Sequence, residues 1–435
     1  MSSVYAQRRA RLLDQIGSGV VVVECGREPR NPTGHDVAYH PRPSFYYLTG
    51  FSERDSVLVL SREADGATKS VLFVLPRDAK AEMWTGRRVG AEAARELVGV
   101  DEAYDLTALD EKLPGLLKGH ADLWLEVFEE TPLRGKLLSW CNRRLGAKTL
   151  ADITPQRLHN LAWTLAPMRL YKDEAEIEAI RAAVAVTDPA YRQVMAECRE
   201  GLTEGDLQGI LDGGFLRDGG QGPAYGTIVA SGDNANILHY VNNDQPLRDG
   251  DLVLIDAAAQ KRHYACDVTR TFPVSGRFTA VQRDVYQIVL ESMHAGFAQA
   301  RPDSSMDAIH EATMARLLDG LLELGVLSGS RDELLEKKAA GPFCPYSICH
   351  PIGLNVHDPS PRLTDDGQEL KLQPGAVFTV EPGLYFPADN EELPEHLRGL
   401  GLRIEDDLLI TADGYENLTA GIAKDVDEVE AWCGR

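Results

Sequence analysis

Two aspartates stand inside apolar, β-branched segments of the sequence, where an ionised carboxylate needs a partner. Asp256 ends the run LVLID, and Asp267 lies in YACDVTRTF. Burying a carboxylate without a cation or hydrogen-bond donor is costly. If the two segments form a hairpin that turns on Lys261 and Arg262, the aspartates lie directly opposite each other, with Cβ atoms about 5 Å apart. Two like charges at that separation need a cation or a shared proton.

The same pattern recurs towards the C-terminal end of the chain. Glu381 ends the segment AVFTVE and Glu405 ends GLRIE, while His350 lies in CHPIGLNVHD. Four carboxylates and one imidazole form an oxygen-rich ligand set, which suits two ions such as Mn²⁺, Co²⁺ or Fe²⁺ better than a structural zinc. Two ions bridged by carboxylates can activate a shared water and polarise a carbonyl.

Each of these residues has a simpler interpretation when it is taken alone. A strand aspartate is commonly a turn cap or an ion-pair partner, and a lone His239 or His357 is more often a hydrogen-bonded polar side chain. Arg403, two residues before Glu405, is by itself a solvated strand charge. Because the candidate ligands occur together on strand-like segments, the sequence favours a metal centre over separate structural roles.

The elements that must position these residues fall into two parts. In the first part, short β-rich runs alternate with helical patterns, which is typical of an α/β domain. Strands are predicted at 20–24, 45–51, 56–60 and 70–75, and helices at 90–98 and 131–145. The pattern changes between residues 163 and 172, so we place the domain boundary near residue 170.

The second part begins with a long predicted helix. Asp173 followed by Glu176 fits a capping box at its start, and Pro189 is expected to break or kink it. The Gly-rich segment 213–232 leads into a strand. Further strands are predicted at 252–259 and 264–272, helices at 280–300 and 305–324, and strand-like segments at AVFTVEPGLYF and LGLRIEDDLLI.

Composition excludes several classes of protein. The chain has 435 residues, 43% hydrophobic and 26% charged, which is typical of a soluble protein with two or more domains. Its net charge of −22, without a basic stripe, makes nucleic acid an unsuitable partner. No apolar run is long enough to span a membrane, and the first residues carry Arg and Asp where a secretory signal needs an apolar core. The seven scattered cysteines favour a reduced, cytoplasmic protein.

An ordered set of motifs resembles the proline-specific metallopeptidases with the pita-bread fold. The motifs are ILHY, LVLIDAA, CDVTRTFPV, HPIGLNVHD, VEPGLY and LRIEDD. In the first part, SFYYLTGF, AEMWTGRRVG and MRLYKDEAEI are similar to the N-terminal domain and linker of bacterial aminopeptidase P. The resemblance implies an α/β (α+β) protein, with a creatinase-like α/β domain at 1–168 and a pita-bread catalytic domain at 172–435.

The resemblance also implies a role for each matched position. Asp256 would chelate one manganese ion, and Asp267 and Glu405 would bridge both ions. His350 and Glu381 would hold the second ion, and Glu381 would assist proton transfer from a bridging hydroxide. Cobalt, iron and zinc are alternatives to manganese.

Further residues would surround the ions. His239 and His357 would line the substrate site, where neutral imidazoles can donate to a developing oxyanion or a leaving nitrogen. Arg403 is expected beside Glu405. The remaining residues implied to contact substrate, with Trp84 walling the pocket from the smaller domain, are Trp84, Tyr225, Tyr346 and Tyr385.

The chain departs from the family's HGxxHxxG motif. Tyr346 stands where relatives carry a histidine four residues before His350, with Cys344 and Cys349 nearby. Tyrosine donates a hydrogen bond but is not a cation near neutral pH. Turnover or substrate range is therefore expected to differ from that of relatives.

Taken together, the motifs imply an Xaa-Pro aminopeptidase, a hydrolase that removes the residue before a proline at the second position of a peptide. A cytoplasmic homodimer or homotetramer is expected. An Xaa-Pro dipeptidase (prolidase) shares the fold and the ligands, so the two stay open at this point. A non-enzymatic pita-bread binding module is a second alternative, and an amidinohydrolase is disfavoured by the carboxylate set.

Overall fold

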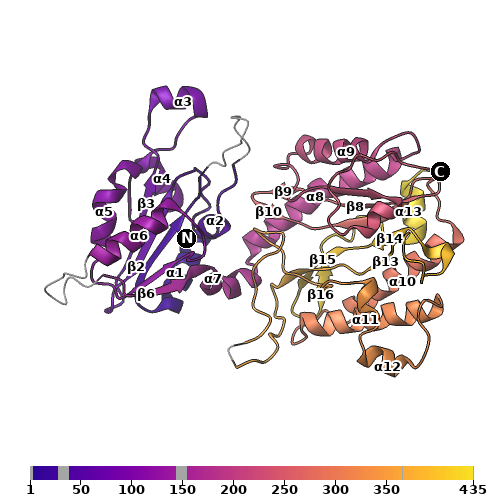
Figure 1. Ribbon diagram of the computed structural model, residues 1–435. Helices are drawn as coiled ribbons and strands as arrows, with labels where there is room; N and C mark the ends of the chain where they lie inside the picture. The colour runs from indigo at the N-terminus through magenta and orange to yellow at the C-terminus, as the bar shows by residue number, and fades with distance from the viewer. Residues whose placement is uncertain (1–2, 28–38, 144–153, 365, 435) are drawn as a thin grey trace. The chain divides into compact units, whose positions relative to one another are not determined.

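The computed structural model describes residues 3–27, 39–143, 154–364 and 366–434. The chain divides into two compact units, Met1–Met168 and Arg169–Arg435 (Figure 1). Among the described residues, no helix combines the length and the apolar composition needed to cross a bilayer. The seven cysteines form no disulfide bond within the described residues.

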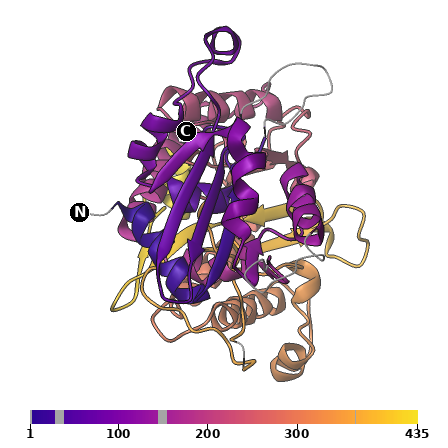
Figure 2. The same ribbon diagram turned by 90° about the vertical axis from the view of Figure 1, so that its left-hand side faces the viewer.

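The first unit is built on a six-stranded sheet with the strand order β4-β3-β2-β1-β5-β6, whose twisted strands lie side by side in Figure 2. The strands are β1 (Gly19–Glu24), β2 (Val57–Arg62), β3 (Thr68–Val74), β4 (Glu102–Asp105), β5 (Asp122–Leu125) and β6 (Arg157–Asn160). The helices are α1 (Val4–Ile16), α2 (Pro43–Thr49), α3 (Ala79–Thr85), α4 (Ala91–Val98), α5 (Leu109–Leu117) and α6 (Pro132–Arg143), and α7 (Leu161–Leu170) runs across the unit boundary. The mixed α/β prediction for this part is confirmed.

One predicted strand of the first unit is wrong. Residues 45–51 lie mostly in α2, which begins with Pro43 at its first turn and ends at Gly50 in the left-handed conformation, with φ 63°. Aromatic residues favour strands on average, but helix-start and helix-stop residues and burial of Phe45 and Leu48 decide the outcome here. Of the predicted helix 131–145, residues 144 and 145 lie outside the described residues.

The second unit contains several small antiparallel sheets around one large hydrophobic core. Its strands are β7 (Ile228–Ser231), β8 (Leu252–Asp256), β9 (Gln260–Lys261), β10 (Tyr264–Ala265), β11 (Thr269–Pro273), β12 (Val377–Val380), β13 (Gly383–Phe386), β14 (Leu400–Arg403), β15 (Asp406–Ile410) and β16 (Tyr415–Asn417). Its helices are α8 (Glu174–Glu197), α9 (Glu204–Arg217), α10 (Ala280–Phe297), α11 (Met306–Glu323), α12 (Arg331–Glu336) and α13 (Val426–Trp432). The predicted strands and helices of this part are present.

Helix α8 confirms one prediction and contradicts another. The capping box between Asp173 and Glu176 is formed. The helix nevertheless continues through Pro189 to Glu197, where the sequence predicted a break or kink. Residues on both sides of the proline are buried in the same core, and their packing outweighs the lost hydrogen bond.

The hairpin that carries the two aspartates turns one residue later than predicted. Its central residues are Arg262 and His263, with φ 50° and 64°, which fits a tight two-residue turn. Asp256 therefore pairs with Thr269, and Asp267 lies in the unpaired stretch just before β11. The residue opposite Asp256 is thus two positions away from Asp267. Because side chains alternate with a period of two, both aspartates stay on the same face of the hairpin.

A buried ion pair joins β11 to β15, next to the residues that the sequence predicts as metal ligands. The Arg270 guanidinium on β11 donates to Asp406 Oδ1 of β15 at 2.6 Å and to the Glu405 carbonyl oxygen at 2.6 Å. Burial alone would raise the pKa of Asp406, but Arg270 and Lys424 hold it below its ordinary value. The pair thus fixes the backbone at Glu405 relative to the hairpin of Asp267.

Replacing Arg270 with leucine is expected to lower the free energy of unfolding of the second unit by about 3–5 kcal/mol, because it leaves the Asp406 carboxylate buried without its main partner. Urea denaturation followed by circular dichroism measures this. As a matched control, Lys337→Leu removes an exposed pair with Glu333 and should leave stability close to wild type. Equal stability of the two variants would contradict the structural importance of the buried pair.

Candidate metal centre

Three of the predicted ligands converge in the second unit. Asp267, His350 and Glu405 each offer a ligand atom, and these atoms lie within 4.8 Å of one another. Asp267 and Glu405 are 4% and 1% exposed. Glu405 separates β14 from β15, and its backbone N–H donates to the Thr269 carbonyl oxygen at 3.0 Å, so the two hairpins are joined at the site.

Asp256 and Glu381 border these three residues. The Nε2 atom of His350 lies 3.4 Å from Glu381 Oε1 and 3.6 Å from Asp267 Oδ2. Asp256 Oδ2 accepts a hydrogen bond from Arg403, while its Oδ1 is buried and has no partner among the described residues. A buried carboxylate oxygen left without a donor is what a cation site requires.

Burial and mutual repulsion make the carboxyl groups difficult to ionise. Burial is the main cause that raises the pKa of Asp267, Glu381 and Glu405 well above ordinary values. Repulsion adds to it: Asp256 acts on all three, Asp267 acts on Glu405, and Glu405 acts on Glu381. Such a cluster is favourable in its ionised form only when cations lie among the oxygens.

The imidazole of His350 has the charge and the orientation that a metal ligand needs. Burial, assisted by the neighbouring His357, lowers the pKa of His350 to about 4, so the ring is neutral at pH 7. Nδ1 lies 3.2 Å from the Pro351 carbonyl oxygen and donates to it as Nδ1–H. This contact leaves the Nε2 lone pair directed at the carboxylates. The donor set therefore fits divalent cations held by four carboxylates and one imidazole.

The two ends of the segment from His350 to His357 lie close together. The two rings meet edge to face, with centroids 4.3 Å apart. The backbone N–H of Asp358 donates to the Pro351 carbonyl oxygen at 2.8 Å, and the buried Asp358 carboxylate pairs with Arg169 and Lys172. His357 is itself exposed, so its ring is accessible beside His350.

The sequence led us to expect Arg403 beside Glu405, and the two side chains are joined through Thr269. Arg403 Nε donates to Thr269 Oγ1 at 3.2 Å, and this hydroxyl donates to Glu405 Oε2 at 2.7 Å. The guanidinium also donates directly to Asp256 Oδ2 and to the Tyr385 hydroxyl, both at 2.7 Å. The positive charge of Arg403 opposes the rise in the pKa of Glu405. Arg403 on β14 pairs with Gly383 on β13, and β14 packs against β8, which carries Asp256.

Two tyrosines from the predicted set are hydrogen-bonded next to the ligands. The Tyr225 hydroxyl donates to Asp267 Oδ1, and the Tyr346 hydroxyl donates to the Glu381 carbonyl oxygen at 3.1 Å. Tyr346 also lies 2.9 Å from the Tyr385 hydroxyl. Burial is the main cause that raises the pKa of Tyr346 well above its ordinary value, so the hydroxyl stays protonated.

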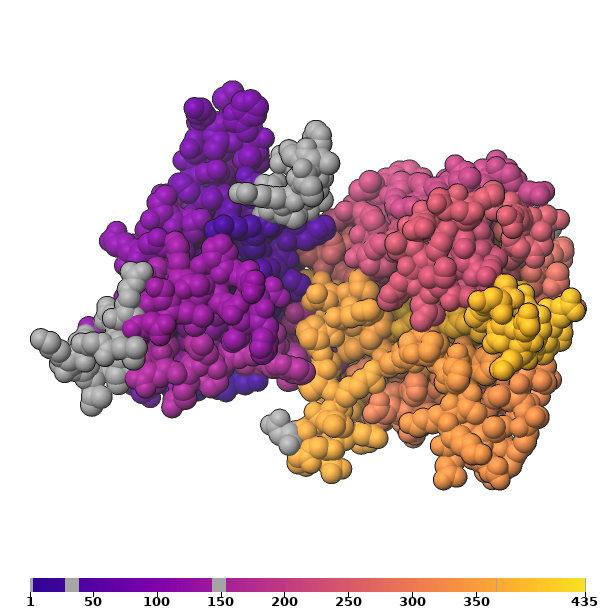
Figure 3. Space-filling model, in the orientation of Figure 1, coloured from indigo at the N-terminus to yellow at the C-terminus, as the bar shows by residue number. Residues whose placement is uncertain are grey.

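Neither His239 nor Trp84 contacts this cluster through a hydrogen bond, an ion pair or a ring contact within the described chain. His239 is exposed and follows the short 3₁₀ helix η4 (Gly232–Asn236), which packs against β8 and β14. Trp84 lies on α3 of the first unit and is 82% exposed, and this helix stands out from the rest of its unit (Figure 3). Their roles stay predictions.

A buried glutamate that no sequence pattern indicated forms hydrogen bonds with the segment around His239. Glu204 is fully buried at the start of α9. Its carboxylate accepts hydrogen bonds from Ser231, Asn234, Tyr240 and Gln245, at 2.7 to 3.0 Å. In the sequence this residue is indistinguishable from an ordinary first-turn acidic residue, because its partners follow 27 to 41 positions later.

Comparison with known families gives two matches along the chain. Residues 178–412 match Metallopeptidase family M24, and residues 5–124 match the Aminopeptidase P, N-terminal domain. The Xaa-Pro aminopeptidase of Escherichia coli K12 is 39% identical over 429 residues, covering 98% of this chain and 96% of that protein. The human Xaa-Pro aminopeptidase 3 is 34% identical, covering 99% of this chain and 86% of that protein.

Solved structures agree with these matches. The structure of Pseudomonas aeruginosa aminopeptidase PepP superposes with a TM-score of 0.94 at 36% identity, covering 99% of this chain and 97% of that one. Zinc-substituted E. coli aminopeptidase P in complex with product gives the same TM-score at 38% identity, with the same coverage of both chains.

Once metal is removed by a chelator, the second unit is expected to become less stable as the pH rises above about 6.5. The folded pKa values of Asp267, Glu381 and Glu405 lie above their unfolded values, so the metal-free folded state binds extra protons and loses stability as they dissociate. His350 does not change this trend. Its pKa is about 4 in the folded state and 6.5 ordinarily, so the ring is mostly neutral in both states above this pH.

Calorimetry of EDTA-treated protein at a series of pH values measures the change in melting temperature. Glu405→Gln removes one of the titrating carboxyls, so it should make the melting temperature depend less on pH. Manganese added at about 100 times its dissociation constant should restore about 2.7 kcal/mol. A melting temperature that rises with pH in EDTA would contradict the proposed crowding of carboxylates.

Proposed function

The chain belongs to metallopeptidase family M24, and on that premise we propose that it is an Xaa-Pro aminopeptidase, which hydrolyses the peptide bond before a proline at the second position. The observation that carries the proposal is the convergence of Asp267, His350 and Glu405, with the unpartnered Asp256 Oδ1 beside them. Similarity to Xaa-Pro aminopeptidases over nearly the whole chain supports the substrate class.

We propose that two divalent ions, most suitably Mn²⁺, occupy the cluster. The residues that would hold them are Asp256, Asp267, His350, Glu381 and Glu405. Bound there, the ions would supply activation of a water molecule and polarisation of the scissile carbonyl. Asp267 and Glu405 are the most central residues, which suits bridging ligands, and Arg403 holds Asp256 in a fixed orientation.

The chain's own groups supply proton transfer and orientation. Glu381 is partly accessible and lies 3.4 Å from His350 Nε2, a position that suits a group that takes a proton from water and returns it to the leaving nitrogen. A proline nitrogen has no N–H and must be protonated to leave. His357, exposed beside His350, and His239 are the proposed donors to the tetrahedral intermediate, while Tyr225 and Tyr385 orient Asp267 and Arg403.

We assign residues 1–168 to an N-terminal aminopeptidase P-like domain and 172–435 to the catalytic domain. Trp84 of the first domain is proposed to wall the substrate site. The cysteines, which form no disulfide bond within the described residues, support a reducing compartment such as the cytoplasm. We propose that the enzyme works there as a homo-oligomer.

Replacing Asp267 with alanine is expected to reduce hydrolysis of Xaa-Pro peptides at least about 10²-fold, because this carboxylate faces both His350 and the acidic cluster. Turnover and bound metal are measured on the same purified samples. Asp389→Ala, in an exposed loop, serves as the control. Near-normal turnover of Asp267→Ala with added Mn²⁺ would refute the assignment.

Replacing Tyr346 with histidine is expected to raise kcat on standard Xaa-Pro substrates by roughly tenfold, because an imidazole beside Glu381 can carry a proton that the phenol holds at every working pH. Tyr346→Phe, which removes the hydroxyl, should lower kcat. An unchanged or lower rate for the histidine variant would mean that the segment around residue 346 is fitted to tyrosine.

A further inference from the structure

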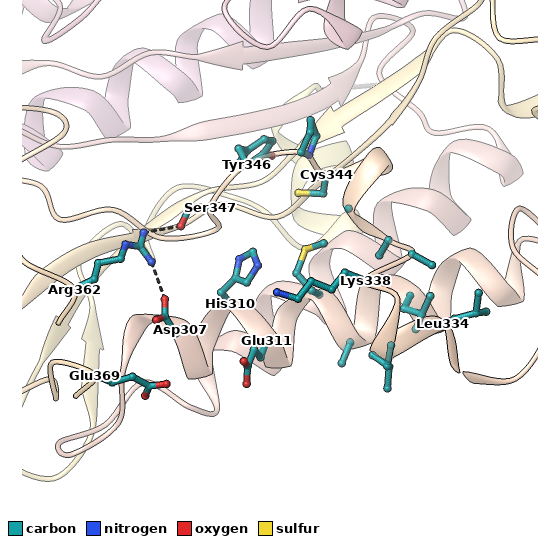
Figure 4. A pocket seen from close by; sticks show the side chains of 18 residues that line it. Asp307, His310, Glu311, Leu334, Lys338, Cys344, Tyr346, Ser347, Arg362 and Glu369 are labelled. Atoms are coloured by element: carbon teal, nitrogen blue, oxygen red, sulfur yellow. Dashed lines mark hydrogen bonds and ion pairs between the residues drawn. The ribbon is translucent and has the colours of Figure 1, made fainter. Parts of the chain in front are cut away.

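A large pocket of the second unit lies next to the candidate metal centre but contains none of its ligands. It measures about 1110 Å³, between α11, the turn after α12 and the segment 344–347 (Figure 4). Pockets that bind drug-sized molecules measure about 300–1,000 Å³. The volume is therefore ample for several peptide residues, and nothing in the proposed reaction so far uses it.

The lining of this pocket combines an apolar surface with a few polar groups. Met314 on α11 and Leu334 and Leu335 on α12 supply apolar surface. Figure 4 shows Lys338 extending from the α12 side towards His310 and Glu311 on α11. The lining also carries the carboxylates of Asp307, Glu311 and Glu369, of which Asp307 pairs with Arg362 and Glu369 with Lys371. It therefore offers apolar contacts and, at Lys338, one point of attachment for a negative group.

Lys338 is the cation of this lining that is available for a ligand. Arg362 is already engaged, donating to Asp307 Oδ1 at 2.9 Å and to Ser347 Oγ at 2.7 Å. Lys338 takes part in no ion pair within the described residues. It also adopts φ 51° just after α12, a position where glycine is the usual and less strained residue.

His310 adds a fixed donor to the same lining. Its Nδ1 accepts a hydrogen bond from the Ile348 backbone N–H at 3.3 Å, so the proton of the neutral ring lies on Nε2. Burial is the main cause that lowers the pKa of His310 below its ordinary value, which keeps the ring neutral. The imidazole therefore presents an N–H group beside Lys338.

The pocket and the candidate metal centre share one side chain. Tyr346 lines the pocket, and its hydroxyl donates to the Glu381 carbonyl oxygen at 3.1 Å. The same segment continues directly into His350. A ligand that fills the pocket thus lies one side chain from the proposed site of hydrolysis, which a substrate molecule extending past that site would reach.

We propose that this pocket binds the C-terminal segment of peptide substrates, downstream of the proline, with apolar side chains against Met314 and Leu334 and the terminal carboxylate paired with Lys338. The inference rests on the proposed function and extends it. A free C-terminus is therefore expected to strengthen the binding of peptides long enough to reach the pocket.

Hydrolysis of a length series tests the proposal. Peptides that begin Xaa-Pro and continue with leucine or alanine are supplied as free acids and as C-terminal amides, from the dipeptide upward, to the Mn²⁺-loaded enzyme. Wild type should cleave the longer free acids with higher kcat/KM than their amides. Lys338→Met should lower kcat/KM for those acids about threefold, remove the difference from the amides, and leave the dipeptide unchanged.

Two further variants complete the test. Lys337→Met, the adjacent exposed lysine outside the pocket, should behave as wild type. Ala315→Trp, which fills the pocket from α11, should raise KM for the longer peptides and leave kcat for the shortest cleaved substrate unchanged. Length dependence that is the same in wild type, Lys338→Met and Ala315→Trp would overturn the pocket assignment alone. Failure of wild type to cleave every peptide would overturn the proposed function, and this inference with it.

Discussion

The structure of the second unit depends on one unfavourable interaction, the crowding of carboxylates inside a protein. Asp256, Asp267, Glu381 and Glu405 approach one another where water is largely excluded, and burial and repulsion both oppose the ionisation of the last three. A fold gains nothing from such a cluster by itself. Divalent cations turn the repulsion into attraction, so the same groups become a tight and preorganised site. Metal binding and the stability of this unit are therefore coupled.

The scaffold around the cluster is built from buried charges that fix backbone rather than touch cations. Arg270 joins Asp406 to the Glu405 carbonyl, Glu204 gathers the segment that leads to His239, and Asp358 ties the His357 segment to Arg169 and Lys172. Each such pair is costly unless its geometry is satisfied, so it favours one arrangement of the loops. The ligands are thereby held before any ion arrives.

The sequence indicated most elements and every member of the candidate cluster, because the signals are local. Apolar runs mark the strands, Asp173 and Glu176 mark the start of α8, and acidic residues in apolar runs are conspicuous. The errors arose where packing outweighs local preference. Residues 45–51 have strand-forming side chains but lie mostly in a helix, and α8 passes through Pro189 because both flanks are buried.

By itself, the sequence determined the fold class, the family and the types of ligand, since motif order and residue chemistry are properties of the chain. Only the tertiary structure decided which groups meet. It set the hairpin register that pairs Asp256 with Thr269, placed Arg403 in direct contact with Asp256, and joined Glu204 to residues far along the chain. The pocket of Lys338 likewise exists only once α11, α12 and the segment before His350 are packed. Contacts between distant segments follow from the shapes of packed elements, which no local pattern of residues encodes.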